Sequence, residues 1–240
     1  MPQRRIAACV RALRIGNHDM KKKAALALFS LAGRRDNCAM IAEAGGIPPL
    51  VDLLRLLFHV RARPRLVDAS ADVKRKAART LGQLANHNPN NRVLIAEAGA
   101  IPPLVELLRD GSEEAAWALG FLAHNADNKV LIAEAGGIPL LVELVRDFKS
   151  KKATNALNNL ARNNDANAVA VAVAVNLDAL DALVELARHG RVTFKGYSLV
   201  SNAGLPVKRK AALVVAQLIE ATAPRTRVSR YIKAAIGSYL

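Results

Sequence analysis

The sequence has little of what catalysis, metal binding or disulfide bonding requires. Its two cysteines, Cys9 and Cys38, are too few for a disulfide framework and lack the spacing of a metal site. This low cysteine content suits a reducing compartment, so we expect a cytoplasmic or nuclear protein. No HExxH, CxxC or phosphate-binding loop is present, and the histidines show no catalytic arrangement. The sequence therefore predicts no enzyme and no cofactor or metal site.

Aromatic side chains and long apolar runs are also scarce. Aromatic residues make up 4% of the chain while hydrophobic residues make up 52%, so alanine, leucine and valine must form the core. This composition favours closely packed helices over a β-sandwich. The longest weakly polar stretch, 166–177, is shorter than the roughly 18 apolar residues that a transmembrane helix needs. We expect an all-α protein without a transmembrane segment or a signal peptide.

Positive charge, in contrast, is abundant and unevenly placed. The formal net charge of the 240 residues is +15. Residues 1–100 carry +11 and residues 166–240 carry +6, whereas residues 101–165 carry −2. A field of this sign attracts acidic proteins, nucleic acid or anionic membranes, and it says little about the fold.

One pattern of about twenty residues occurs three times. The copies at 37–55, 91–110 and 128–147 read NCAMIAEAGGIPPLVDLLR, NRVLIAEAGAIPPLVELLRD and NKVLIAEAGGIPLLVELVRD. In each copy a short helix is expected to end at a glycine, which supplies the left-handed backbone that closes a helix. A second helix then begins at the prolines and places its leucines on one face. The three closing glycines are Gly45, Gly99 and Gly136.

A third, alanine-rich helix follows and is expected five times. Its copies share a pair of small residues followed by a hydrophobic–x–x–Leu–small pattern, and small residues let neighbouring helices approach closely. A unit of about 40 residues cannot bury its apolar faces alone, so successive units must stack and share one continuous core. The five segments are 22–33, 74–86, 112–124, 150–162 and 207–220.

The pattern NKVLIAEAGGIPLLVELVRD followed by AAWALGFLA resembles the armadillo repeat of beta-catenin-like and vacuolar-protein-8-like proteins. The resemblance covers roughly 4–222 and is strongest over 91–165. It implies three helices per repeat, a right-handed superhelical solenoid and a concave groove lined by the third helices. We therefore expect one solenoid over 1–240, with about four full repeats after a truncated first repeat. The expected repeats are 1–36, 37–90, 91–127, 128–165 and 166–222, with a C-terminal cap at 223–240.

Two segments depart from the pattern by insertion, and one by degeneration. The insertions, about 56–72 and 189–206, each add about 16 residues and look loop-like. They are either tolerated surface insertions or functional loops. The fifth repeat lacks the AEAGGIP turn, and its AVAVAVAV run at 168–175 alternates as a strand does. Because alanine is a poor strand former, we interpret this run as a distorted first helix.

The third helices carry the candidate ligand-binding residues. In importin-alpha-like armadillo proteins a Trp and an Asn four residues later repeat along these helices, and here only Trp117 and Asn159 match. The resemblance implies that Trp117 and Phe121 anchor an apolar side chain while amides hold the backbone of a bound segment. Packing within the stack is the alternative role for Trp117. The predicted groove residues are Arg79, Gln83, Trp117, Phe121, Asn155, Asn159 and Gln217.

Basic runs stand at the starts of four third helices. Cations there oppose the helix macrodipole at a cost of a few tenths of a kcal/mol each, so a chain that repeats them can gain something in return. We expect a basic rim that favours an acidic partner segment, with solubility as the alternative explanation. The rim residues are Lys74, Arg75, Lys76, Lys151, Lys152, Lys208, Arg209 and Lys210.

The sequence thus predicts a non-catalytic scaffold for a protein partner. Nucleic-acid binding is an alternative, supported by the charge and by Arg61, Arg63 and Arg65, although aromatic residues for base stacking are few. An importin-alpha-like nuclear-import adaptor is a further alternative, but it would need an acidic groove for basic cargo. A substrate-recognition module of a larger protein, such as a ubiquitin ligase, also fits the repeats.

Overall fold

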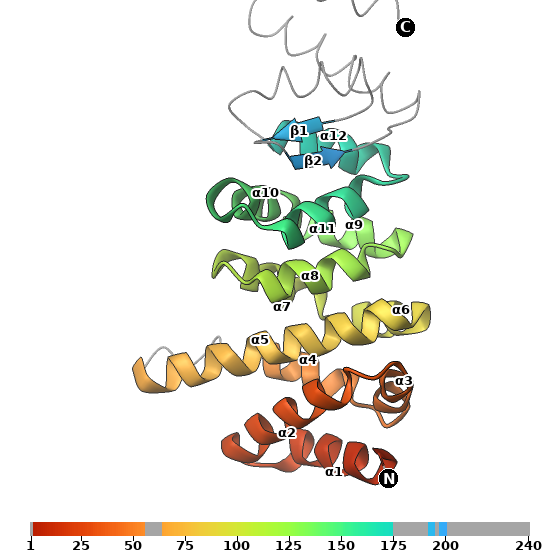
Figure 1. Ribbon diagram of the computed structural model, residues 1–240, viewed down its shortest axis with the longest axis vertical. Helices are drawn as coiled ribbons and strands as arrows, with labels where there is room; N and C mark the ends of the chain where they lie inside the picture. Colours follow the sequence, from red (N-terminus) through yellow and green to blue (C-terminus); the bar gives the residue numbers. More distant parts are fainter. Residues whose placement is uncertain (1, 56–63, 175–191, 195–196, 201–240) are drawn as a thin grey trace, which may run out of the picture. The chain divides into compact units, whose positions relative to one another are not determined.

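The computed structural model describes residues 2–55, 64–174, 192–194 and 197–200 (Figure 1). Within them the chain forms twelve helices and two short strands. Two compact units make up the chain, residues 1–137 and residues 138–240.

The first unit consists of the predicted groups of three helices. Helices α3, α4 and α5 form one complete repeat and α6, α7 and α8 the next, while α1 and α2 correspond to the second and third helices of the repeat before them. Helix α9 is the first helix of the repeat that follows. The elements are α1 (Pro2–Ile15), α2 (His18–Leu31), α3 (Arg35–Glu43), α4 (Ile47–Arg55), α5 (Pro64–His87), α6 (Pro89–Glu97), α7 (Ile101–Arg109), α8 (Glu113–Leu122) and α9 (Ala126–Glu134).

The second unit continues the helical pattern and adds a hairpin. Helix α11 contacts α12 and strand β2, and the two strands pair antiparallel with Phe194 opposite Tyr197. Helix α10 begins at the last residue of the first unit. The elements are α10 (Gly137–Phe148), α11 (Lys151–Ala161), α12 (Asp165–Ala174), β1 (Val192–Phe194) and β2 (Tyr197–Val200).

The three closing glycines adopt the predicted left-handed conformation. Their φ angles are +70° at Gly45, +73° at Gly99 and +78° at Gly136. Residues with a Cβ pay roughly 1–2 kcal/mol in this region, which explains the choice of glycine. Each first helix therefore ends where the repeated AEAG sequence indicates, at Glu43, Glu97 and Glu134.

Leucine and alanine form the core, as the composition predicts. Helix α5 packs against α2 on one side and α8 on the other, so these third helices lie side by side in the first unit (Figure 1). Their alanine pairs are buried and allow the close approach. Buried leucines fill the space beneath them, each contributing about 1.5–3 kcal/mol of hydrophobic free energy. Fully buried examples are Leu28, Leu50, Leu54, Leu81, Leu84, Leu104, Leu108, Leu119 and Leu122.

A buried asparagine joins each first helix to the third helix before it. The amide Nδ2 of Asn37 donates to the carbonyl of Leu31 at 2.8 Å, and that of Asn91 donates to Leu84 at 3.1 Å. Asn128 repeats the bond to Leu122 at 3.2 Å. These asparagines satisfy carbonyls that a helix end leaves unpaired. Sequence analysis gave them no role, although each is the first letter of its repeated copy.

The loop-like interpretation of the two insertions is wrong where the structure describes them. Helix α5 begins at Pro64, so the second half of the first insertion extends the third helix. Proline is tolerated in a first helical turn, and the segment that follows contains alanines and no glycine. In the second insertion, VTF and YSLV form the hairpin, because β-branched and aromatic residues favour strands. This hairpin is the departure from all-α structure among the described residues.

The alternating AVAVAVAV run is helical over its described residues, 168–174, as interpreted. Helix α12 extends over Asp165–Ala174, and its Ala168 and Val171 are fully buried. The fifth third helix, 207–220, the cap at 223–240 and residues 56–63 of the first insertion lie outside the described residues.

Candidate functional site

In the first unit, aromatic and cationic side chains of helices α2, α5 and α8 lie on the solvent-exposed side of these helices. Helix α2 contributes one aromatic ring, α5 contributes two cations and an amide, and α8 contributes two aromatic rings. All are exposed or half-buried. We call this set the third-helix surface, and its residues are Phe29, Lys76, Arg79, Gln83, Trp117 and Phe121.

Two cations of α5 lie over the Phe29 ring of α2. The Nζ of Lys76 is 5.0 Å from the ring centroid, and the Cζ of Arg79 is 5.2 Å from it. Cation–π contacts at exposed sites contribute about 0.5–1 kcal/mol each, enough to restrain the side chains. Among the described residues, no carboxylate lies within ion-pair distance of either cation. Their positive charges are thus held in place without being neutralised.

Trp117 packs against α5 and keeps part of its ring exposed. A Cβ added at Gly82 would lie 2.6 Å from Cε3 and 2.7 Å from Cζ3 of the indole, so the ring occupies the place of a missing side chain. Phe121 meets Trp117 edge to face, with centroids 4.8 Å apart and an interplanar angle of 87°. Trp117 therefore packs between the third helices of neighbouring repeats and also contributes to the exposed surface. Sequence analysis missed Gly82, which a glycine inside a strong helical pattern could have signalled.

Gln83 follows Gly82 in α5 and is half-buried. Its side-chain Oε1 is shielded from solvent and accepts no hydrogen bond from the described residues. An unsatisfied buried acceptor costs about 1–3 kcal/mol. The backbone carbonyl of Gln83 also accepts a long contact from the Sγ of Cys38, at 3.9 Å.

The predicted rim residues of α5 do not share one exposed face. Lys74 is only 7% exposed, and burial lowers its pKa while Asp110 and Glu106 oppose that shift. Arg75 is exposed and lies 4.0 Å from Asp72. Successive residues of a helix point about 100° apart, so a run of three cations cannot form one rim. Lys76 alone of the three belongs to the third-helix surface.

The remaining predicted residues belong to the second unit. On α11, Asn155 and Lys151 are exposed, whereas Asn159 and Lys152 are half-buried. They form a separate group on that helix. The other four, Gln217, Lys208, Arg209 and Lys210, lie outside the described residues.

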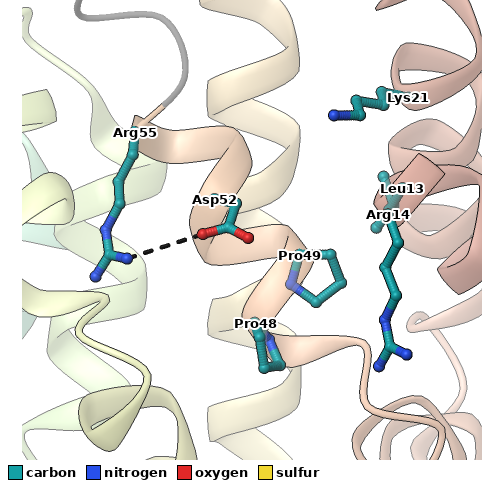
Figure 2. Close-up of a pocket in the computed structure, with 7 residues that line it drawn as sticks. All are labelled: Leu13, Arg14, Lys21, Pro48, Pro49, Asp52 and Arg55. Atoms are coloured by element: carbon teal, nitrogen blue, oxygen red, sulfur yellow. Dashed lines mark ion pairs between the residues drawn. The ribbon is translucent and has the colours of Figure 1, made fainter. Parts of the chain in front are cut away.

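A cavity of about 600 Å³ opens between α1, α2 and α4 (Figure 2). It combines apolar walls with three cations and one carboxylate, and sequence analysis did not anticipate it. Figure 2 shows Lys21 and Asp52 reaching into the space from opposite sides. The lining residues are Leu13, Arg14, Lys21, Pro48, Pro49, Asp52 and Arg55.

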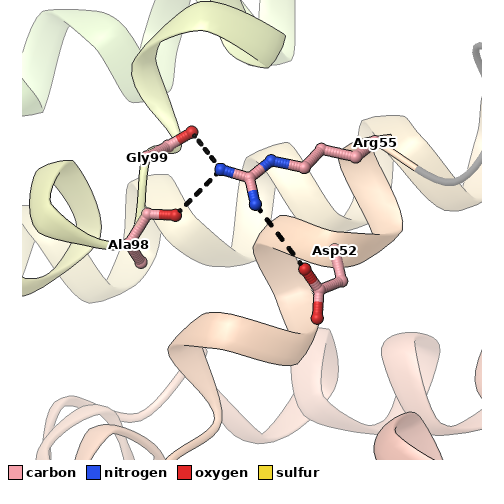
Figure 3. Close-up of polar contacts among 4 residues, drawn as sticks. All are labelled: Asp52, Arg55, Ala98 and Gly99. Atoms are coloured by element: carbon pink, nitrogen blue, oxygen red, sulfur yellow. Dashed lines mark hydrogen bonds and ion pairs between the residues drawn. The ribbon is translucent and has the colours of Figure 1, made fainter.

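Two arginines of this cavity hold the repeats together. The Nη2 of Arg55 donates to the carbonyls of Ala98 and Gly99 at 3.2 and 3.1 Å (Figure 3), and its Nη1 lies 3.8 Å from Asp52. Arg14 donates in the same way to the carbonyl of Gly45 at 3.1 Å. These guanidinium groups cap helix ends in the next repeat. We call this contact the arginine cap.

The described residues have neither a metal-binding cluster nor a membrane-spanning helix. They contain no group of three or more His, Cys, Asp or Glu side chains that could hold a metal ion. No helix among them combines the length and the apolar character needed to cross a membrane.

Comparison with known proteins agrees with this geometry. Residues 88–124 match the armadillo/beta-catenin-like repeat family. An Arabidopsis thaliana protein described as an ARM repeat protein interacting with ABF2 is 34% identical over 96 residues. The aligned region covers 38% of this chain and 12% of that protein, so the chain spans a small part of its relative's length.

Solved structures extend the likeness across the chain. A designed armadillo repeat protein is 25% identical, with a TM-score of 0.60 and coverage of 88% of this chain and 80% of that one. A second designed armadillo repeat protein, solved with a (KR)4 peptide, is 23% identical, with a TM-score of 0.62 and coverage of 98% of both chains. The chain therefore contains the armadillo repeat and has the fold of armadillo repeat proteins.

Proposed function

We propose that the chain is a non-catalytic scaffold that binds an acidic segment of a protein partner on the third-helix surface. One observation carries the proposal: Lys76 and Arg79 are stacked on Phe29 with no carboxylate of the described residues within ion-pair distance, and the α5 helix that carries them also packs against the partly exposed Trp117. Designed armadillo proteins of this fold are described as made for modular peptide recognition, which supports a peptide ligand.

The sign of the charge selects the kind of peptide. One designed relative in fold holds a (KR)4 peptide, whereas the third-helix surface here is itself cationic. Like charges facing each other cost several kcal/mol at an interface, which disfavours basic segments and hence an import adaptor for basic cargo. Opposite charges speed association and fix the register of the bound segment.

Each part of the third-helix surface has a task in this proposal. A ligand carboxylate would accept hydrogen bonds from the Arg79 guanidinium, which is restrained by Phe29 before binding. An apolar ligand side chain would pack on Trp117 and Phe121, whose large rings are typical anchors of interfaces. The side chain of Gln83 would have to rotate out of its shielded position before its oxygen could accept a ligand N–H.

A peptide titration tests the proposal. We would measure the fluorescence anisotropy of a labelled peptide of about twelve residues, in which glutamate and leucine alternate. A peptide of this length can cross stacked helices that lie about 10 Å apart. The double variant Lys76→Glu/Arg79→Glu should bind at least about tenfold more weakly, since it replaces attraction by repulsion. The matched control Arg4→Glu/Arg5→Glu reverses the same charge at exposed positions of α1 and should bind within about twofold of wild type.

Equal weakening in the two double variants would reduce the proposal to nonspecific attraction by net charge.

Nucleic acid is the second candidate, because the chain carries a net charge of +15. A single-stranded oligonucleotide in the same assay should bind more weakly than the acidic peptide. Tighter binding, with a steep loss on adding salt, would favour nucleic acid instead. We place the protein in the cytoplasm or nucleus, which imaging of a tagged full-length protein would check.

A further inference from the structure

A second surface in the first unit is apolar and lies on the first helices. Val93 and Leu94 of α6 are 41% and 45% exposed, and Val130 and Leu131 of α9 are 45% and 44% exposed. The two pairs occupy equivalent positions of consecutive repeats, and α6 contacts α9. We call these four residues the first-helix ridge.

Folding of the repeats does not account for these side chains. The neighbouring isoleucines, Ile95 and Ile132, are fully buried and supply the contacts of α6 and α9 with the core. Contiguous exposed apolar residues on a soluble surface commonly mark a site of interaction. Here the two equivalent exposed pairs lie on helices that contact each other.

The charges around the first-helix ridge are negative, although the chain is strongly basic. Glu97 and Glu134 are exposed at the last positions of α6 and α9. A carboxylate there opposes the helix macrodipole, so both glutamates add to the negative potential of a helix C-terminus. At α6 the Arg55 guanidinium on the carbonyls of Ala98 and Gly99 offsets part of this potential, whereas α9 has no such cation on Gly136 among the described residues. The cations of these helices turn inward: Nε of Arg92 donates to the carbonyl of Ala85 at 2.9 Å, and Lys129 is buried.

The spacing of the first-helix ridge fits a helical ligand. Packed helices lie about 8–10 Å apart, and an α-helix advances about 10 Å in seven residues. A helix lying across α6 and α9 would therefore place apolar side chains at positions i and i+7 on the Val–Leu pairs. Basic residues beside those anchors would face Glu97 and Glu134.

We propose that the first-helix ridge binds an amphipathic helix of a partner protein, with apolar anchors seven residues apart and lysine or arginine beside them. This site is distinct from the third-helix surface and opposite in charge. One chain could then hold an acidic segment and a basic helix at the same time.

The test uses a synthetic amphipathic helix of about 18 residues, with leucines at i, i+3 and i+7 flanked by lysines, and a second peptide in which glutamates replace the lysines. Binding to the full chain is measured by anisotropy. The variant Leu94→Ser/Leu131→Ser should bind the lysine peptide at least about tenfold more weakly. The variant Glu97→Gln/Glu134→Gln should weaken it by about threefold to fivefold, and the glutamate peptide should bind poorly to wild type.

Controls separate this surface from folding defects and from the proposed function. Met20→Ser replaces an apolar residue that is 49% exposed elsewhere in the first unit, and it should leave binding unchanged. The ridge variant should keep its helical circular dichroism and bind the acidic peptide as wild type does. Undetectable binding of the lysine peptide, or equal binding by wild type and Leu94→Ser/Leu131→Ser, would overturn the proposal. The proposal would also be overturned if the wild-type protein self-associates or adsorbs to anionic vesicles and Leu94→Ser/Leu131→Ser does not. In that case a second copy or a membrane, and not a partner helix, would cover the first-helix ridge.

Discussion

The junction between α4 and α6 and the junction between α7 and α9 are built from nearly the same sequence, yet only one has an arginine cap. At the first, Arg55 donates to the carbonyls of Ala98 and Gly99. At the second, the Nε of the equivalent Arg109 donates instead to Glu106 at 3.0 Å. Apart from Gly136 and its two chain neighbours, the described residues place no heavy atom within 4 Å of the point where Gly136 would carry a Cβ.

The length of one neighbouring acidic side chain explains the difference. Asp52 stands three residues before Arg55 and reaches only to 3.8 Å, leaving Nη2 to cap the next repeat. Glu106 stands at the same place before Arg109 and, with one more methylene, reaches its Nε. Arg11, not an acid, stands three residues before Arg14, and Arg14 forms the cap on Gly45. Near-identical repeats can therefore differ in how firmly they are joined.

The largest expected effect comes from adding a methyl group at the closing glycines. Gly99→Ala should destabilise its junction by about 2–3 kcal/mol, because the left-handed backbone costs about 1–2 kcal/mol and the new Cβ would stand 2.5 Å from Nη2 of Arg55. Gly136→Ala should cost only the about 1–2 kcal/mol of the left-handed backbone, because no side chain of the described residues stands in the way of its Cβ. Native-state hydrogen exchange of α6 and α9 measures both local stabilities. Equal losses would show that the arginine cap contributes nothing.

Removing the arginines should give the next largest effect. Arg55→Ala should cost about 1 kcal/mol, since two carbonyls lose a charged donor, whereas Arg109→Ala should cost a few tenths, as exposed ion pairs usually do. Hydrogen exchange at the C-terminal end of α6 in the first variant, and of α9 in the second, reports the loss. A larger effect from Arg109→Ala would reverse the ranking of the two junctions.

Exchanging the acids should move the cap from one junction to the other by smaller amounts. Asp52→Glu should draw Arg55 away from Gly99 and cost about 0.5 kcal/mol, while Glu106→Asp should free Arg109 and gain about as much at α9. Crystal structures of the two variants would show which acceptor each arginine chooses. An unchanged Arg55 cap in Asp52→Glu would refute the side-chain-length explanation.

The smallest expected effect concerns Lys74, which is buried near Glu106 and Asp110 of the second junction. Burial lowers its pKa from 10.5, so between the folded pKa and 10.5 the unfolded chain binds more protons than the folded one. The free energy of unfolding should therefore gain a small positive term as pH rises through that window. In Lys74→Met this term should be absent in denaturant titrations, and an identical pH profile would contradict the assignment.

Periodic features of the fold were predictable from the sequence. Gly45, Gly99 and Gly136 close their helices as the repeated AEAG letters indicate, and α8 and α11 begin where a serine caps them. Such features depend on local chemistry and on a repeat that reinforces it. The extension of α5 to Pro64 was missed because the first insertion interrupts the repeat. Only the helix propensity of individual residues remains there, and that propensity is a weak signal.

The candidate site was predictable only in part, since its geometry depends on contacts between repeats. Trp117, Phe121, Arg79 and Gln83 lie where the repeat alignment places them on the third helices. The packing of Trp117 on Gly82 and of Arg79 over Phe29 joins residues 35 or more positions apart, which no local pattern encodes. The burial of Lys74 was missed because a run of cations resembles a solvated face.

Hydroxyl-radical footprinting with the acidic peptide tests the binding surface most directly. Aromatic side chains react readily, so bound peptide should protect Trp117, Phe121 and Phe29, while Leu94 and Leu131 of the first-helix ridge keep the reactivity of the free protein. In Lys76→Glu/Arg79→Glu the protection should disappear. Protection that avoids the third-helix surface, or that is the same in this variant as in wild type, would contradict the account.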